Sequence, residues 1–134
     1  MREIKFRGKR LDNGEWIKGN SIVRVGDGFF ICDWTGVAIK KSEFYNLFTE
    51  VAPATVGQYT GLKDKNGKEI WEGDIMTIRN DDEDYPLPET PFVIVFSEGA
   101  FCIAEDQESP WGPINTPLLQ KVIGNIHDNP ELLK

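Results

Sequence analysis

The sequence predicts a mainly β protein, with an α+β arrangement left open by one ambiguous segment. Turn-forming residues recur about every 12 residues, a spacing typical of all-β domains. Several runs between these turns alternate apolar and polar residues, as half-buried strands do. Asn66-Gly67 is the strongest hairpin signal in the chain, because a two-residue Asn-Gly turn accepts positive φ at both positions.

The first third of the chain predicts an antiparallel meander of short strands. Turn residues at 12–14 and 26–28 separate its alternating runs, so successive strands fold back on one another. The runs expected to form strands cover residues 2–10, 15–18, 21–25 and 29–33. Residues 42–51 fit both the helical and the strand period, and the surrounding strands favour a strand near residues 47–51.

The remainder of the chain predicts further strands joined by loops of unequal length. Ala52-Pro53-Ala54 is the expected boundary between two subdomains, residues 1–54 and 55–134. The predicted strands cover residues 57–62, 68–71, 75–79, 92–96, 100–104 and 122–126. Residues 80–91 contain four consecutive acids and three prolines, which predict an exposed and mobile loop. Residues 105–117 predict a second polar loop.

Three separate segments resemble the YopX family of phage and prophage proteins. They are MREIKFR at the start, QYTGLKDKNGKEIWEGDIM in the middle and VIGNIHDNPELL near the end. The resemblance spans nearly the whole chain. It implies a small SH3-like β-barrel within residues 55–134 and a location in the cytoplasm of a bacterial host cell. It implies no particular activity.

The charge is unevenly distributed along the sequence. Residues 1–67 carry 11 Lys/Arg and 8 Asp/Glu, whereas residues 68–134 carry 4 and 14, so the formal charge of −7 divides into +3 and −10. Such polarity favours contact between unlike halves, within or between chains. We therefore expect self-association, with an interface that involves Lys5, Arg7 or Lys9.

Several classes of protein are not expected from this sequence. The N-terminus lacks the apolar region of a signal peptide, and no run approaches the roughly 18 apolar residues of a membrane span. Cys32 and Cys102 stand far apart in β-prone runs, which predicts buried, reduced thiols. We therefore expect a cytoplasmic protein without membrane association.

No catalytic, cofactor or metal site is predicted. The run at residues 64–69 superficially resembles a calcium loop, but alignment on Gly67 places Leu62 and Gly73 at two ligand positions. Glycine spacing fits no phosphate loop, and cysteine spacing fits no zinc site. An enzyme that uses Glu72, Asp74 or His127 stays open as a less favoured alternative.

The candidate partner-binding residues are a basic stripe and two tryptophans. Lys5, Arg7 and Lys9 fall on one side of the first predicted strand, near Phe6 and Trp16 and together with Arg2 and Arg10. Trp34 and Trp111 lie in loop-like sequence, where they either anchor a partner or cover the core.

These features predict a non-enzymatic module that binds another protein or assembles with itself. Nucleic-acid binding through the basic stripe is a less favoured alternative, because the acidic second half repels phosphate. A third possibility is an acidic mimic of DNA that occupies a host enzyme, suggested by the charge of −10 after residue 67.

Overall fold

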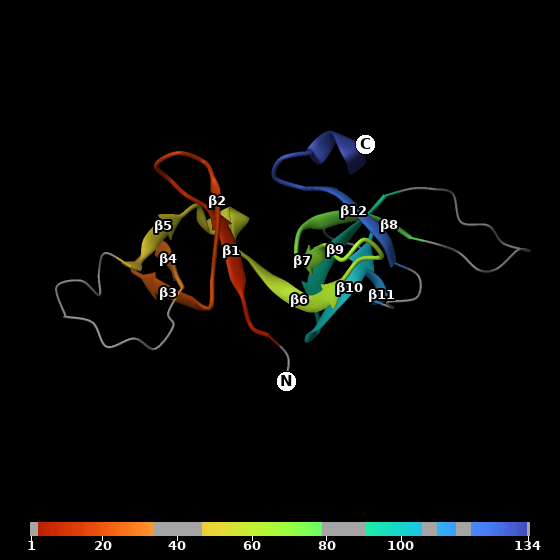
Figure 1. Cartoon of the computed structure of the whole chain (residues 1–134), viewed down its shortest axis with the longest axis horizontal. Coiled ribbons are helices and arrows are strands. Elements are labelled where there is room, and N and C mark those ends of the chain that lie inside the picture. Colours follow the sequence, from red (N-terminus) through yellow and green to blue (C-terminus); the bar gives the residue numbers. More distant parts are fainter. Residues whose placement is uncertain (1–2, 34–46, 79–90, 106–109, 115–118, 134) are drawn as a thin grey trace, which may run out of the picture. The chain divides into compact units, whose positions relative to one another are not determined.

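The computed structural model describes residues 3–33, 47–78, 91–105, 110–114 and 119–133 (Figure 1). These residues form antiparallel sheets and contain no α-helix, so the prediction of a mainly β protein is confirmed. The strands are β1 (Phe6–Lys9), β2 (Trp16–Gly19), β3 (Ser21–Val25), β4 (Gly28–Cys32), β5 (Thr49–Val51), β6 (Gly57–Lys63), β7 (Glu69–Trp71), β8 (Asp74–Ile78), β9 (Phe92–Ser97), β10 (Ala100–Ala104), β11 (Pro110–Pro113) and β12 (Leu119–Asn125). Two short 3₁₀ helices are η2 (Pro53–Thr55) and η4 (Pro130–Leu133).

Residue contacts divide the chain into a first unit, Met1–Tyr59, and a second unit, Thr60–Lys134. Strand β6 runs through the junction, so its first residues belong to one unit and its last residues to the other. The first unit carries 9 Lys/Arg and 7 Asp/Glu, and the second carries 6 and 15. Their formal charges are therefore +2 and −9. The predicted boundary between residues 54 and 55 stays a prediction.

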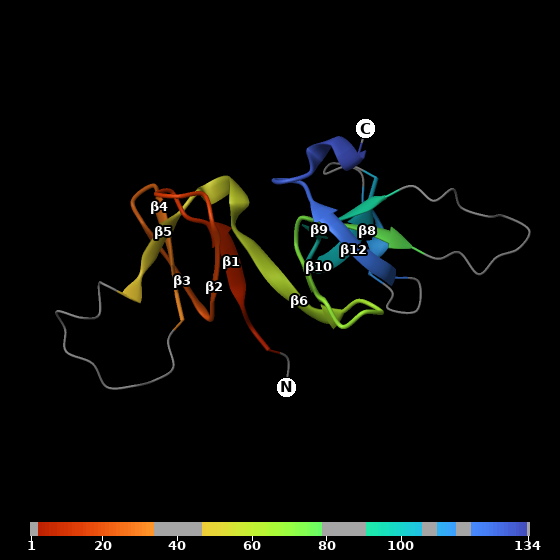
Figure 2. The ribbon, with the colours of Figure 1, turned by 45° about the horizontal axis from the view of Figure 1, so that its top comes forward.

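The first unit contains two small sheets that pack together. In one, β1 pairs with β2 on one side and with Gly57 and Gln58 of β6 on the other. The other sheet has the order β3-β4-β5 and lies beside β1 and β2 in both ribbon views (Figure 2). Ile31 and Val51 supply its buried face, at 1% and 0% exposure. The strand predicted near residues 47–51 is present as β5.

Two glycines allow the sheets of the first unit to approach closely. A Cβ atom on Gly8 would lie 2.9 Å from the Cβ atom of Val51, and one on Gly19 would overlap the carbonyl oxygen of Cys32. Any side chain at these positions would push the layers apart. The side of β1 that carries Gly8 is therefore the buried side, and the opposite side points away from this packing.

The second unit contains a five-stranded sheet with the order β11-β10-β9-β8-β12. Its core is centred on Ile70, Met76 and Ile94, each with 0% exposure. The partly buried side chains around this core are Leu62, Phe101, Ile103, Ile114 and Val122. Burying each large aliphatic side chain contributes about 1.5–3 kcal/mol, so this cluster is a main source of the unit's stability.

The SH3-like barrel implied by the family resemblance is not confirmed. Within the described ranges, none of the sheets closes on itself. The sequence also predicts a polar loop at residues 105–117, whereas Pro110–Pro113 form strand β11 and pair with β10. Proline is tolerated there because β11 is at the end of the strand order, where a missing N–H costs no ladder bond.

The prediction of a two-residue Asn66-Gly67 turn is wrong, because the loop that joins β6 to β7 contains three residues. The Asp64 N–H donates to the Lys68 carbonyl at 2.8 Å, and the Gly67 N–H donates to the Asp64 carbonyl at 3.0 Å. The loop therefore contains three residues, with positive φ at Gly67 (82°) and not at Asn66. This is the three-residue hairpin loop in which a left-handed residue follows a type I turn.

A two-residue turn with positive φ at both positions occurs elsewhere, between β9 and β10. Ser97 pairs with Ala100, and the two residues between them, Glu98 and Gly99, have φ values of 51° and 80°. Among the described residues, Glu98 is the only residue other than glycine that has a positive φ. The packing of β9 against β10 therefore imposes on a glutamate the geometry that the sequence signal predicts for Asn66.

The prediction for the two cysteines is confirmed. Cys32 and Cys102 are buried, with 2% and 6% exposure, and neither forms a disulfide. Burial raises the pKa of the Cys32 thiol, and the charge of Asp33 adds to this effect. In the part of the chain that the structure describes, no helix has the length and apolar character of a membrane span.

Two predicted features lie outside the described residues. They are the side chain of Trp34 and the acidic loop at residues 80–91, apart from Pro91. Trp111 belongs to strand β11, but its side chain is not among those described. The roles predicted for both tryptophans stay predictions.

Candidate functional site

The structure places Lys5, Arg7 and Lys9 on one face of the sheet formed by β1, β2 and the start of β6. Residues paired directly across neighbouring strands project on the same side. Arg7 is paired with Lys18, and Lys9 with Trp16. We call this surface the basic–aromatic face, and it consists of Lys5, Arg7, Lys9, Trp16, Lys18 and Tyr59.

Tyr59 joins the face through the pairing of β6 with β1. Its backbone N–H donates to the carbonyl oxygen of Lys5 at 2.9 Å, which continues the antiparallel register of Arg7 with Gly57. Tyr59 is therefore opposite Lys5. Phe6, which the sequence places near the stripe, projects to the other side of the sheet because it alternates with these residues.

The cations of the face lie over its aromatic rings. The guanidinium carbon of Arg7 is 4.6 Å from the ring centre of Trp16, and the Lys9 ammonium nitrogen is 5.5 Å from the same centre. The Lys5 ammonium nitrogen is 4.7 Å from the ring centre of Tyr59. Such cation–π contacts contribute about 0.5–1 kcal/mol each at exposed sites. They hold long side chains in defined positions on the sheet.

Burial differs among the members of the face. Tyr59 is 3% exposed, so it contributes almost no accessible surface to the face. Lys5, Arg7, Lys9 and Trp16 are half-buried, and Lys18 is exposed. The Lys5 ammonium also approaches the carboxylate of Glu3 at 3.5 Å. Glu3 is well exposed, and an ion pair of this kind contributes little to stability.

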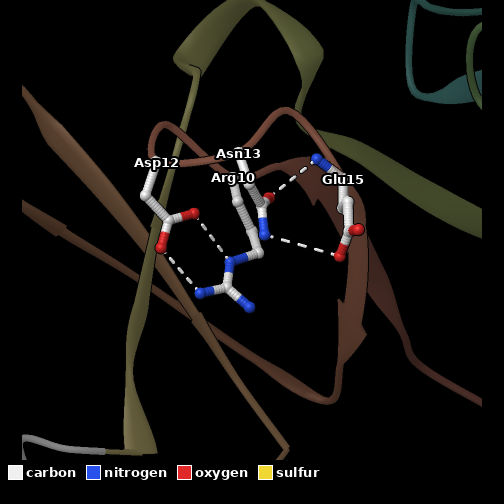
Figure 3. Close-up of polar contacts among 4 residues, drawn as sticks. All are labelled: Arg10, Asp12, Asn13 and Glu15. Carbon is white, nitrogen blue, oxygen red and sulfur yellow. Dashed lines mark hydrogen bonds and ion pairs between the residues drawn. The ribbon is translucent and has the colours of Figure 1, made fainter.

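Arg10 does not belong to the basic–aromatic face, although the sequence groups it with the basic stripe. Figure 3 shows its guanidinium in a two-pronged contact with Asp12, through Nε to Oδ1 at 2.9 Å and Nη2 to Oδ2 at 2.7 Å. The hydrogen bonds from Arg10 are the main reason why the pKa of the Asp12 carboxyl is lowered, and they raise the pKa of Arg10. Arg10 thus contacts the loop that connects β1 to β2.

The same connection sets the register of the face. The Glu15 N–H donates to Oδ1 of Asn13 at 2.9 Å (Figure 3), and the Arg10 N–H donates to the Glu15 carbonyl at 2.9 Å. Gly14 completes the loop with a φ of 73°. Because a shift by one residue would turn Trp16 to the opposite side of the sheet, these bonds keep it beside Arg7.

A hollow of about 390 Å³ lies at one end of the basic–aromatic face. Two members of the face, Lys5 and Lys18, are part of its wall. The complete lining is Glu3, Ile4, Lys5, Lys18, Gly19, Asn20 and Asp33. Ile4 leaves 51% of its surface exposed beside this hollow. The face and the hollow therefore form one continuous feature of the first unit.

The second unit has a hollow of about 350 Å³ near Cys102. Its lining is Ser97, Glu98, Ala100, Cys102, Pro110, Gly112 and Pro113. These residues supply a single charge, that of Glu98, and no histidine or basic group. The hollow thus lacks the combination of charge and aromatic side chains that marks the first unit.

Within the described ranges, no three His, Cys, Asp or Glu side chains gather as metal ligands would. Asp74, one of the residues named for an enzyme, is 2% exposed, and its Oδ2 accepts a hydrogen bond from the Trp71 N–H at 2.8 Å. His127 lies beside Gly73, where a Cβ atom would be 3.6 Å from Nε2. These contacts close the corner between β7 and β8.

Tyr59 and Lys18 are members of the face that the sequence analysis does not identify. Lys18 is detectable from the β1–β2 register, because it is opposite Arg7. Tyr59 comes from a distant strand, and its position depends on the pairing of β6 with β1. No local sequence signal indicates that pairing.

Comparison with known proteins places the chain in a family. Residues 5–134 match the family described as YopX protein. Among solved structures, the crystal structure of protein EF1440 from Enterococcus faecalis is similar, with 26% sequence identity, a TM-score of 0.54 and coverage of 100% of both chains. No curated protein matches the sequence. The family match covers nearly the whole chain, and the chain therefore belongs to the YopX family.

Proposed function

We propose that the chain is a non-enzymatic module that binds an acidic surface of another protein through the basic–aromatic face. The stacking of Arg7 and Lys9 on Trp16 carries this proposal. Arginine and tryptophan are enriched at the centres of protein interfaces. Side chains that are held in place before binding lose less entropy when a partner binds. The cations of the face are therefore preorganised to bind carboxylates.

The covered aromatic rings favour a protein partner over a nucleic acid. Single-stranded nucleic acid binds by stacking its bases on accessible ring faces. Here Arg7 and Lys9 lie over Trp16, and Tyr59 is buried beneath Lys5. The net charge of −7 also opposes the approach of a phosphate backbone.

The proposed setting is the cytoplasm of a bacterial cell that carries a phage or prophage. Its support is the resemblance of the three sequence segments to phage and prophage members of the YopX family. In that setting the protein is an accessory factor that acts by contact with other proteins.

Self-assembly is the second candidate, because the chain supplies its own acidic partner. The first unit has a formal charge of +2 and the second has −9. The basic–aromatic face of one copy is complementary in charge to the second unit of another copy. Contacts of this head-to-tail kind close into rings or extend into filaments.

A charge reversal with a matched control tests the proposed function. Arg7→Glu removes the central cation of the face. Arg24→Glu reverses an exposed cation of the same unit that also lies near a ring, at 5.9 Å from the centre of Phe29, but on strand β3. Tagged wild-type protein and both variants are used to isolate partners from infected host cells, and each partner is then purified for titration.

We expect an acidic protein that binds the wild type and Arg24→Glu at least about tenfold more tightly than Arg7→Glu. Equal binding of the partner by all three proteins would overturn the role of the face. Salt-sensitive binding of a short DNA or RNA that Arg7→Glu abolishes would favour the nucleic-acid alternative. A DNA-binding host enzyme inhibited equally by all three proteins would favour an acidic DNA mimic.

A further inference from the structure

We infer that the basic–aromatic face and the adjoining hollow bind one extended acidic peptide segment, with an apolar side chain of that segment inserted in the hollow. This inference rests on the proposed function and specifies the partner of the same site. Lys5 and Lys18 belong to both the face and the hollow, so a ligand that extends along the face as far as Lys5 reaches the hollow.

The charges around the hollow favour an uncharged side chain inside it. Its lining contains two lysines, Lys5 and Lys18, and two acids, Glu3 and Asp33. Opposite charges in equal number give a carboxylate no net advantage there. Arg7 and Lys9, by contrast, lie farther along the face and outside the hollow. The acidic residues of a ligand therefore belong over Arg7 and Lys9.

The hollow has room for a large aliphatic side chain, and part of its wall is apolar. The volume of about 390 Å³ falls within the range of binding pockets, about 300–1,000 Å³. Ile4 is 51% exposed at this site, although an isoleucine gains free energy when it is covered. The aliphatic stems of the two lysines extend this apolar surface.

Gly19 contributes closely packed main chain to the wall of the hollow. Any Cβ atom at this position would overlap the carbonyl oxygen of Cys32, so the chain at Gly19 lies directly on strand β4. At this point the wall is packed main chain and not a side chain that can move aside.

The spacing of the face matches an extended ligand. Side chains on one side of a strand repeat every two residues, about 6.6 Å. Arg7 and Lys9 of β1 follow this repeat, and Lys5, just before β1, continues it through its pairing with Tyr59. An extended peptide has the same repeat, so an apolar residue beside Lys5 places its next alternate residues over Arg7 and Lys9. The expected ligand carries one aliphatic residue followed by acids at alternate positions.

Two synthetic peptides of equal length and charge test the inference. Both carry glutamate at the third residue and at every second residue after it, with serine between, so that the glutamates share one side of the extended peptide with the first residue. The first residue is isoleucine in one peptide and serine in the other. A third peptide, with lysine in place of glutamate, controls for the sign of charge. Binding is measured by calorimetry and mapped by amide chemical shifts on the whole chain.

We expect the isoleucine peptide to bind about tenfold more tightly than its serine counterpart. Asn20→Trp, which places a large side chain in the hollow, is expected to remove this advantage and to leave the weaker binding intact. Ile4→Ser is a second variant that removes the exposed apolar wall and is expected to act in the same direction. Arg7→Glu is expected to weaken the binding of both acidic peptides, whereas Arg24→Glu is expected to leave the binding of both unchanged.

The outcomes separate the inference from the proposed function. Equal binding of the two acidic peptides, with both weakened by Arg7→Glu, would overturn the anchor in the hollow and leave the acidic partner in place. Binding of neither acidic peptide would overturn both. An isoleucine advantage that survives Asn20→Trp and Ile4→Ser would place the anchor elsewhere and contradict the inference.

Discussion

The carboxylate of Asp64, in the β6–β7 loop, is bonded to strand β12 of the second unit, because its Oδ2 accepts the N–H of Val122, 58 residues later in the chain, at 3.0 Å. Its other oxygen, Oδ1, accepts the N–H groups of Asn66 and Lys68 at 2.8 and 2.9 Å. One buried side chain therefore shapes the β6–β7 loop and attaches that loop to β12. Asp64 is 8% exposed, so water cannot readily replace these bonds.

Replacing Asp64 with asparagine is expected to lower the free energy of unfolding by about 1–3 kcal/mol. An amide keeps one acceptor oxygen, but its NH₂ group cannot accept the remaining backbone N–H. Urea unfolding followed by circular dichroism measures the loss. Asp27→Asn, in the exposed turn between β3 and β4, is the control and should change stability by less than about 0.5 kcal/mol.

The same carboxylate makes the second unit sensitive to acid. Burial alone would raise the pKa of Asp64, but the backbone hydrogen bonds from Val122, Lys68 and Asn66 outweigh it and lower the pKa. A lowered pKa in the folded state means that the carboxylate stabilises the fold above its unfolded pKa of about 3.9. That stability is lost as pH falls through the folded value.

The stability difference between wild type and Asp64→Asn should therefore be constant near neutral pH and shrink below about pH 4. Urea unfolding at a series of pH values measures it, and the subtraction removes the effects of other carboxylates. A difference that is the same at pH 3 and pH 7 would show that Asp64 does not titrate with a lowered pKa.

Gly67→Val is expected to destabilise the protein by about 1 kcal/mol or more, because a β-branched residue resists positive φ. Asn66→Ala should cost less than about 0.5 kcal/mol, since Asn66 lacks positive φ. Thermal and urea unfolding of both variants provide the measurement. Comparable losses at the two positions would support the two-residue turn that the sequence predicts.

Gly19→Ala should destabilise the first unit by about 1–3 kcal/mol, because the new methyl group overlaps main chain and the sheets must separate. Gly112→Ala is the control, since a Cβ atom there meets nothing within 4 Å and φ is not positive. Urea unfolding measures both variants. A Gly19→Ala protein as stable as the control would show that β1–β2 does not pack closely on β4.

Self-association is expected at low salt and high protein concentration, and it should weaken as salt is added. Arg7→Glu should reduce the mass measured by light scattering, whereas Arg24→Glu should not. A protein that is monomeric at low and high salt would contradict the expectation. An oligomer indifferent to salt would retain the assembly and remove its electrostatic cause.

Local patterns predict much of the fold and part of the candidate site. Strand alternation places Lys5, Arg7 and Lys9 on one side of a strand, as the structure shows. The long-range pairings are not predictable in this way. The position of Tyr59 depends on the pairing of β6 with β1, and the turn at Asn66 depends on the Asp64 side chain. In both cases, a distant strand or a side-chain bond decides between conformations that the local sequence permits.

The two buried cysteines give each unit a chemical reporter of its own opening. Cys32 belongs to the first unit and Cys102 to the second, and alkylating reagents attack a thiolate that solvent reaches. The rate at which each thiol is modified, resolved by peptide mass, thus reports the local opening equilibrium of its unit. Whether the halves of this chain unfold together or separately can be read from native protein without a single substitution.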